Sequence, residues 1–367
     1  MNVKTKSSLK CIAPYKQGQS TIAGVAEPIK LSSNELPYPP SPAAQAAYDA
    51  TAVQLGRYPD GSQADLRAAI SEIHGVDVAN LFCSNGSEEG IGLVLRVLLS
   101  PDDSVVMSQN SFIMAEIYAA ASGAEIIKVP EINHCIDVDG VLASVRPDTK
   151  IVYLCSPNNP TGTYLTIDQI TRLEAELPGD VVLMLDGAYA EFVRGDDYDS
   201  GIQTLFKPDG RVIVTRTFSK GYGMAALRIG WVVAPNSVID AVSRLRTPFN
   251  TNAPALAAAA AAMRDQEYLN EVTEMVNDTR GWFVAGLQNL GLNVVPSQAN
   301  FVLIPFEGGG DEANQIDAAL QAAGIIARPV SGANNEIRIS IGTQDDMETC
   351  LRVISEWWDA RTPSSTD

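Results

Sequence analysis

The sequence predicts an α/β fold: a large, doubly wound and mostly parallel sheet domain, plus a smaller α+β domain. Between about residues 80 and 235, short runs rich in Val, Ile and Leu alternate with helical patterns, which is typical of a parallel sheet covered on both faces. After Pro235 the pattern changes to long helices and then to mixed short strands and helices. We expect residues 1–30 to form an N-terminal segment that packs on the small domain, 31–248 the large domain, and 249–367 the small domain.

Each element follows from the period and length of its apolar run. Strands of the large sheet are expected at 80–85, 103–109, 124–130, 150–156, 180–186, 211–217 and 228–234. Patterns long enough for crossover helices occupy 87–100 and 166–177. Long helices are expected over 237–250 and 254–290, with interruptions near Pro248 and Pro254. The small domain should hold strands at 299–306, 324–330 and 336–342, and helices at 312–323 and 345–360.

Composition excludes several classes of function. The chain has 26 basic and 44 acidic residues, a net charge of −18, which opposes binding to nucleic acid or to an anionic membrane. No segment approaches the roughly 18 consecutive apolar residues of a membrane span, so we expect a cytoplasmic protein. The five cysteines are scattered and the histidines number only two, so neither a disulfide framework nor a metal site is expected.

Polar segments follow four of the predicted strands, at the sheet edge where α/β proteins bind ligands. They contain Gly86 and Ser87, residues 158–162, Asp186 with Tyr189, and Ser219 with Lys220. A helix N-terminus at Gly86 suits a phosphate, a buried Asp186 needs a cation or N–H donor, and a desolvated Lys220 could form a Schiff base. Each also has a structural alternative: a turn, a helix cap or a solvated side chain.

The segment 221–226 superficially fits the dinucleotide-binding pattern G-x-G-x-x-A. That pattern should lead from a strand into a helix, whereas the residues that follow here, 228–234, predict another strand. We therefore reject a dinucleotide site.

Four motifs in this order, SNGSEEG (84–90), SPNNPTGT (156–163), DGAYAEF (186–192) and RTFSKGYGMAALRIG (216–230), resemble those of the fold-type I, pyridoxal-phosphate-dependent aminotransferases. Further matches occur at 31–42, 56–67, 296–303 and 336–342. With these, the chain is similar to the histidinol-phosphate aminotransferase branch from about Tyr15 to Thr343.

The resemblance implies pyridoxal 5'-phosphate as the cofactor and assigns four catalytic residues. Lys220 would form the Schiff base with the cofactor and later move the proton between substrate Cα and cofactor. Asp186 would keep the ring nitrogen protonated, which makes the ring an electron sink. Asn159 and Tyr189 would hydrogen-bond the phenolic oxygen of the cofactor.

The remaining cofactor contacts implied by the resemblance surround the ring and its phosphate. The phosphate would be held by Gly86, Ser87, Thr217, Ser219 and Arg228. Phe112 would stack on the ring, although an aromatic residue there could equally be core. Tyr58 would reach the phosphate of the partner subunit, which makes a homodimer the functional unit; as an alternative, it lies in a surface turn.

The resemblance assigns the anionic end of the substrate to Tyr15, Asn34, Arg328 and Arg338. The implied reaction interconverts histidinol phosphate and 2-oxoglutarate with imidazole-acetol phosphate and glutamate, in histidine biosynthesis. An aromatic (phenylalanine) aminotransferase, a decarboxylase resembling the threonine-phosphate enzymes, and a non-catalytic role are the alternatives. Departures from the family pattern are Gly187 in place of Glu, Ala226 in place of Gly, and changes at 110, 111 and 115 around Phe112.

Overall fold

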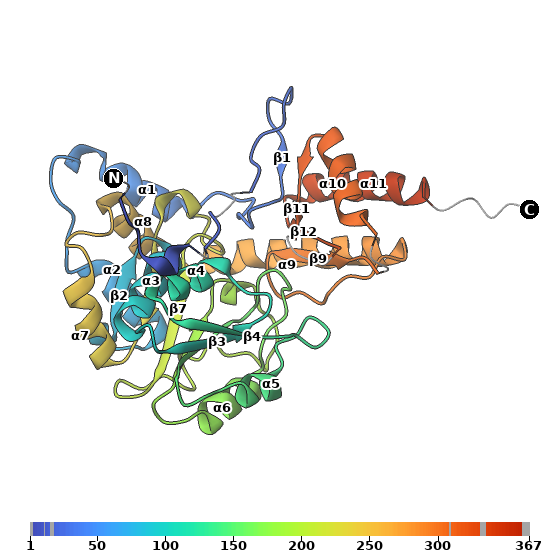
Figure 1. Cartoon of the computed structure of the whole chain (residues 1–367). Coiled ribbons are helices and arrows are strands. Elements are labelled where there is room, and N and C mark those ends of the chain that lie inside the picture. Colours follow the sequence, from blue (N-terminus) through green and yellow to red (C-terminus); the bar gives the residue numbers. More distant parts are fainter. Residues whose placement is uncertain (1–2, 11, 15–17, 308–309, 331–334, 362–367) are drawn as a thin grey trace, which may run out of the picture.

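The computed structural model describes residues 3–10, 12–14, 18–307, 310–330 and 335–361, and it confirms the predicted fold class. A seven-stranded sheet of order β2-β8-β7-β6-β5-β3-β4 forms the larger part of the molecule (Figure 1). Its strands are β2 (Leu81–Ser84), β3 (Ser104–Ser108), β4 (Glu125–Val129), β5 (Thr149–Cys155), β6 (Val182–Asp186), β7 (Val212–Thr217) and β8 (Gly230–Val233). All seven predicted strands are therefore present.

Only β8 runs against its neighbours in this sheet, antiparallel to both β2 and β7. The connection between β7 and β8 holds the short 3-10 turn η5 (Ala225–Leu227) and no crossover helix. A strand that follows so short a connection returns antiparallel, because a parallel return needs a longer crossover. The strand directly after residues 221–226 also confirms that this segment is not a dinucleotide motif.

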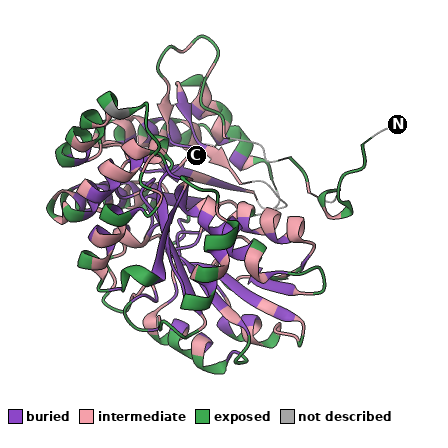
Figure 2. Cartoon of the chain, turned by 90° about the vertical axis from the view of Figure 1, so that its left-hand side faces the viewer, coloured by how far each residue is buried: buried purple, intermediate pink, exposed green. Residues whose placement is uncertain are grey.

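Helices cover both faces of the sheet and bury its strands between them (Figure 2). They are α1 (Pro42–Ala50), α2 (Ala64–His74), α3 (Gly86–Leu98), α4 (Ile113–Ser122), α5 (Val138–Ala143), α6 (Ile167–Glu176), α7 (Asn236–Leu245) and α8 (Ala253–Arg264). Alternate residues of β3 show the two faces: Val105 packs in one core with Leu95 of α3, and Val106 packs in the other with Leu173 of α6.

A smaller unit follows, with a three-stranded antiparallel sheet of order β11-β12-β9 (Figure 1). Its elements are α9 (Gln266–Asn289), β9 (Phe301–Pro305), α10 (Glu312–Ala322), β11 (Arg328–Pro329), β12 (Glu336–Ser340) and α11 (Gln344–Asp359). Near the N-terminus, β1 (Ile29–Lys30) pairs in parallel with β10 (Ile325–Ile326), which ties the N-terminal segment to this unit. No helix among the described residues is long and apolar enough to cross a membrane.

The predicted helix over 254–290 is two helices in the structure, α8 and α9. The break falls at Asp265, whose side chain accepts a hydrogen bond from the Tyr268 backbone N–H and caps α9. The interruption predicted near Pro248 and Pro254 is present, because α7 ends at Leu245 and α8 begins at Ala253, with Pro254 in its first turn, where proline is tolerated. The buried alanines of α8 belong to the core of the large sheet, so packing favours a boundary between the two units at the start of α9. The domain boundary after residue 248 stays a prediction.

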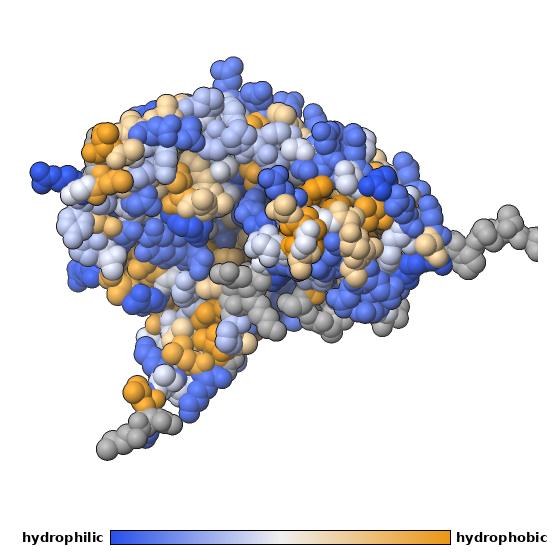
Figure 3. All heavy atoms as spheres, turned by 90° about the horizontal axis from the view of Figure 1, so that it is seen from above, coloured by the Kyte–Doolittle hydropathy of each residue, from blue (hydrophilic) through white to orange (hydrophobic). Residues whose placement is uncertain are grey.

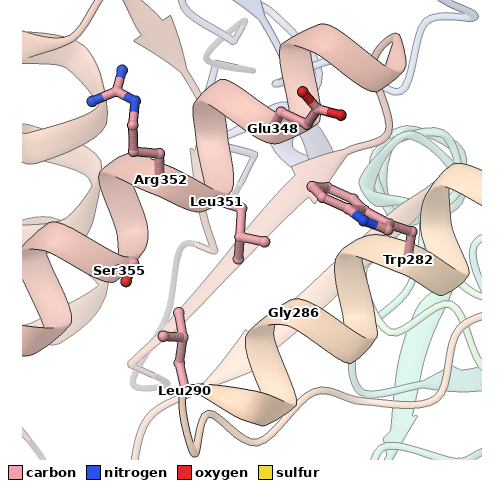
Figure 4. A pocket seen from close by; sticks show the side chains of 7 residues that line it. All are labelled: Trp282, Gly286, Leu290, Glu348, Leu351, Arg352 and Ser355. Carbon is pink, nitrogen blue, oxygen red and sulfur yellow. The ribbon is translucent and has the colours of Figure 1, made fainter.

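Helices α9 and α11 pack closely in the small unit and leave a shallow groove of about 320 Å³ between them (Figure 4). The contact depends on Gly286, since a Cβ atom at this position would lie 2.4 Å from Cδ2 of Leu351. Trp282 borders the groove and is 40% exposed. This helix pair supports the three-stranded sheet that carries Arg328 and Arg338.

We expect Leu173→Ala to destabilise the large unit by about 2–5 kcal/mol, because the side chain is fully buried and its loss leaves a cavity. Equilibrium unfolding in urea measures this change. The exposed Glu176→Gln in the same helix is the matched control and should change the free energy of unfolding by less than about 0.5 kcal/mol. A Leu173→Ala loss no larger than that of the control would contradict the assigned packing.

Candidate active site

A cavity of about 1210 Å³ lies at the carboxyl ends of the large-sheet strands, beside β11 and β12 of the small unit. In the view from above, the surface is hollowed where the two units meet (Figure 3). The sequence-predicted site residues that line the cavity are Asn34, Gly86, Ser87, Phe112, Asn159, Asp186, Tyr189, Thr217, Ser219, Lys220, Arg228, Arg328 and Arg338. Residues far apart in the chain therefore meet because parallel strands end at one sheet edge.

Lys220 lies in the turn after β7, and its Nζ donates a hydrogen bond of 3.0 Å to the carbonyl oxygen of Ser33. The amine also lies 5.8 Å from the centroid of the Tyr189 ring. Burial, followed by the positive charge of Arg338, lowers the pKa of Lys220 to about 7. Much of the amine is therefore neutral near pH 7, which makes it a nucleophile towards a carbonyl group.

Asp186 is the last residue of β6 and is 2% exposed. Its Oδ2 accepts a hydrogen bond of 2.8 Å from the Tyr153 hydroxyl, and its Oδ1 accepts one of 2.9 Å from the Thr215 hydroxyl. Burial raises the pKa of this carboxyl, and the two hydrogen bonds oppose the rise. The backbone N–H of Ala188 and the positive charge of Arg216 also favour the charged form, but among the described residues no basic side chain hydrogen-bonds or ion-pairs with Asp186, so a cationic ligand nitrogen would complete its surroundings.

Tyr153 and Thr215 are site residues that the sequence reasoning missed. Both lie within apolar runs whose pattern indicates a strand and nothing more. Thr215 could have been found from sheet register, because it pairs directly with Asp186 across β6 and β7. Tyr153 lies on β5, the other neighbour of β6, and no local signal marks its hydroxyl.

The N-terminus of α3 forms a cradle that fits a phosphate group. Gly86 has a φ of +70° and leaves room for Arg228, because a Cβ atom there would lie 2.7 Å from its Nη2. Arg228 Nη1 donates to the Ser219 hydroxyl at 3.3 Å, and the Thr217 hydroxyl accepts from the Ser219 backbone N–H at 3.1 Å. Free helix-terminal N–H groups, a guanidinium and hydroxyls are the donors that bind phosphate.

Tyr189 is held by a buried residue that follows β1. Its hydroxyl oxygen accepts a hydrogen bond of 3.0 Å from Nδ2 of Asn34, whose Oδ1 accepts one of 2.9 Å from the Ser340 hydroxyl. Burial raises the pKa of Tyr189, so the phenol is neutral. Because its oxygen already accepts a hydrogen bond, its own O–H remains to donate to a ligand.

Arg328 and Arg338 lie directly opposite each other in the register of β11 and β12. Arg338 Nη1 donates to Oδ1 of Asn159 at 2.6 Å, Nη2 donates to the Ser32 carbonyl at 2.6 Å, and the guanidinium lies 5.4 Å from the centroid of the Phe301 ring. Two guanidinium groups at one wall of the cavity suit an anion. Asn159, predicted to face the cofactor, thereby contacts the wall predicted to bind substrate.

Three aromatic candidates have different outcomes. Phe112 stands at the N-cap of α4 and lines the cavity, as its predicted role requires. Tyr58 does not line the cavity of its own chain; it is 82% exposed and stacks on Phe249 with ring centroids 4.8 Å apart. Tyr15 lies outside the described residues.

The class I and II aminotransferase family model matches residues 26–354. The chain belongs to this family. The aminotransferase is 43% identical to histidinol-phosphate aminotransferase of Ruegeria pomeroyi over 95% of this chain and 96% of the relative. It is 41% identical to histidinol-phosphate aminotransferase of Rhodopseudomonas palustris, over 94% of this chain and 96% of the relative.

The aminotransferase also resembles a crystal structure of histidinol-phosphate aminotransferase from Sinorhizobium meliloti in complex with pyridoxal-5'-phosphate. The TM-score is 0.89, with 27% sequence identity and 99% of each chain covered. An aspartate aminotransferase of Thermus thermophilus superposes with a TM-score of 0.81 at 20% identity, over 96% of this chain and 99% of that one, a likeness that shows the fold alone.

We expect covalent labelling of Lys220 in the cofactor-free protein to rise with pH and to reach half its maximum near pH 7, because only the neutral amine reacts. Labelling with an amine-acylating reagent, followed by mass spectrometry of the Lys220 peptide, measures this midpoint. Free Nα-acetyl-lysine added to the same reaction is the control, and it should reach half labelling near the ordinary lysine pKa of about 10.4. A midpoint for Lys220 equal to that of the control would contradict the burial argument.

Proposed function

We propose that this aminotransferase carries pyridoxal 5'-phosphate and interconverts histidinol phosphate and 2-oxoglutarate with imidazole-acetol phosphate and glutamate, a step of histidine biosynthesis. The observation that carries the proposal is the meeting of Lys220, Asp186 and the phosphate cradle with the Arg328 and Arg338 wall in one cavity. The near full-length similarity to curated histidinol-phosphate aminotransferases supports this choice of substrate.

The residues fit the cofactor at three points. The cradle at Gly86 and Arg228 suits its phosphate, the buried Asp186 suits its ring nitrogen as a cation, and the neutral amine of Lys220 suits its aldehyde. When bound, pyridoxal 5'-phosphate supplies an electron sink for the pair left behind as a substrate Cα proton departs. Phe112 would pack on the ring, and Tyr189 and Asn159 would donate hydrogen bonds to its phenolic oxygen.

Lys220 is the proposed acid and base of the reaction. Its Nζ would take the proton from the substrate Cα and return it to the carbon of the cofactor's aldehyde group, so one amine would serve both transfers. A pKa near 7 suits this work, because a general base and its conjugate acid are both available near neutral pH. A cation that faces Asp186 would stabilise its negative charge, which burial disfavours.

The side of the cavity formed by Arg328 and Arg338 would bind the anionic group of the substrate in both half-reactions. Histidinol phosphate presents a phosphate and 2-oxoglutarate presents a carboxylate, and a guanidinium group binds either anion through paired N–H donors. Arg338, held by Asn159 and the Ser32 carbonyl, is oriented before the substrate arrives. Asn34 and Arg328 border the same wall, and Tyr15 stays a prediction.

We further propose a homodimer in which Tyr58 contributes to the partner's phosphate site. Support comes from its exposure of 82% and from apolar neighbours in sequence, Val53 at 90% and Leu55 at 73% exposed. Large exposed apolar patches mark interfaces. The cytoplasmic location stays a prediction.

The direct test supplies purified enzyme, loaded with pyridoxal 5'-phosphate, with histidinol phosphate and 2-oxoglutarate, and follows glutamate formation. Wild type should form glutamate, and Lys220→Ala should lose turnover by several orders of magnitude while retaining non-covalent cofactor binding, because the variant lacks the amine proposed to react with the cofactor and to move the proton. Near-normal turnover by Lys220→Ala would overturn the mechanism. Carbon dioxide release without glutamate would overturn the reaction in favour of a decarboxylase.

Arg338→Ala should raise KM for histidinol phosphate and for 2-oxoglutarate by about 10- to 100-fold, because it removes a charge-assisted anion contact. Arg338→Lys, which keeps the charge but not the paired donors, should recover part of the loss. Steady-state kinetics with each substrate varied in turn measures both effects. An unchanged KM for both substrates in Arg338→Ala would remove this residue from the substrate site.

A further inference from the structure

A buried ion pair lies beside the active site and takes no part in the chemistry described above. Arg216 Nη2 donates to Oε1 of Glu191 at 2.8 Å, and the two side chains are 8% and 4% exposed. The guanidinium carbon of Arg216 lies 5.7 Å from the centroid of the Trp231 ring. Burying two charges carries a large desolvation cost, and a buried ion pair often stabilises a fold no more than apolar side chains would. Stability alone therefore does not explain why this pair is present.

Both members of the pair occupy space left by glycines that adjoin proposed cofactor-binding residues. A Cβ atom on Gly187, the residue after Asp186, would lie 2.9 Å from Cδ of Arg216. A Cβ atom on Gly221, the residue after Lys220, would lie 2.9 Å from Cβ of Glu191. Neither distance is possible for a real side chain, so a larger residue at either glycine would displace the pair.

The pair also joins the backbone segments that carry the site. Arg216 stands on β7 between Thr215, which hydrogen-bonds Asp186, and Thr217 of the phosphate cradle. Glu191 follows Tyr189 by two residues in the loop after β6. The ion pair therefore links the loop of Asp186 and Tyr189 to the strand that leads into Lys220.

We propose that the Arg216–Glu191 ion pair is a positioning device that fixes the Asp186 segment relative to the Lys220 turn, and that Gly187 and Gly221 are present to admit it. This inference rests on the proposed function, because it concerns the same site. The proposal explains why this chain has Gly187 where the family pattern has Glu, because a Glu side chain at this position would collide with Arg216 in its observed position. Arg216 and Glu191 are positioning residues and need not touch cofactor or substrate.

The test compares Glu191→Gln and Gly187→Ala with wild type and with Leu173→Ala, a destabilised control whose side chain packs away from the cavity. Pyridoxal 5'-phosphate is the probe, and the readouts are the absorbance spectrum and release rate of the bound cofactor, the melting temperature of the cofactor-free protein, and kcat and KM. Both variants should shift the spectrum, release cofactor faster and lower kcat by about 10- to 100-fold, as misplaced reacting groups do. KM for histidinol phosphate should stay within about twofold of the wild-type value, because neither variant changes Arg328 or Arg338.

A double variant, Arg216→Met with Glu191→Leu, separates positioning from stability. It removes both charges and leaves neither unpaired, so its melting temperature should recover towards wild type. Under the proposal, kcat and the spectrum stay altered in this variant. Wild-type spectrum and kcat in Gly187→Ala and in the double variant would overturn the inference, even if Glu191→Gln failed to fold.

The two proposals fail in different ways. A wild-type protein that takes up no pyridoxal 5'-phosphate would overturn the proposed function itself. A wild type that binds the cofactor and turns over, with variants that match it apart from melting temperature, would overturn only the positioning role.

Discussion

Asp186 ends a central strand of the large sheet, is 2% exposed, and is hydrogen-bonded by two neutral hydroxyl groups. A carboxylate in this position is costly unless a cation meets it, and among the described residues no basic side chain hydrogen-bonds or ion-pairs with it. The remaining features of the site follow from the need for that cation. The sheet places Lys220 and the phosphate cradle at the same edge as Asp186, so these residues would hold the aldehyde, the phosphate and the ring nitrogen of one ligand.

The charge distribution also explains how an acidic protein attracts anionic substrates. The whole chain carries a net charge of −18, yet Lys220, Arg228, Arg328 and Arg338 all line one cavity. Local field in a cleft is set by the nearest charges, because salt screens distant surface charges within about 8–10 Å. Burial and then the positive charges of Arg338 and Arg228 lower the pKa of Lys220, so two of the groups proposed to bind anions also favour the neutral form of the reacting amine.

Sequence reasoning predicted the sheet and its seven strands, and it named residues that line the cavity, because strand-end residues such as Asp186 and Lys220 carry strong local signals. It missed the break at Asp265, since the apolar pattern continues through it and a single side-chain cap marks the start of the second helix. It also missed Tyr153 and the Arg216–Glu191 pair, whose roles depend on contacts between strands and loops that no local pattern encodes. The hydrogen bond between Arg338 and Asn159 likewise joins residues far apart in the chain.

Substrate choice is the central claim, and a single-turnover experiment tests it most directly. Enzyme loaded with pyridoxal 5'-phosphate is mixed separately with histidinol phosphate and with phenylalanine, and the loss of the yellow absorbance of the bound cofactor is followed. We expect histidinol phosphate to bleach the cofactor far more efficiently than phenylalanine does. Faster bleaching by phenylalanine would contradict it and would make the protein an aromatic aminotransferase.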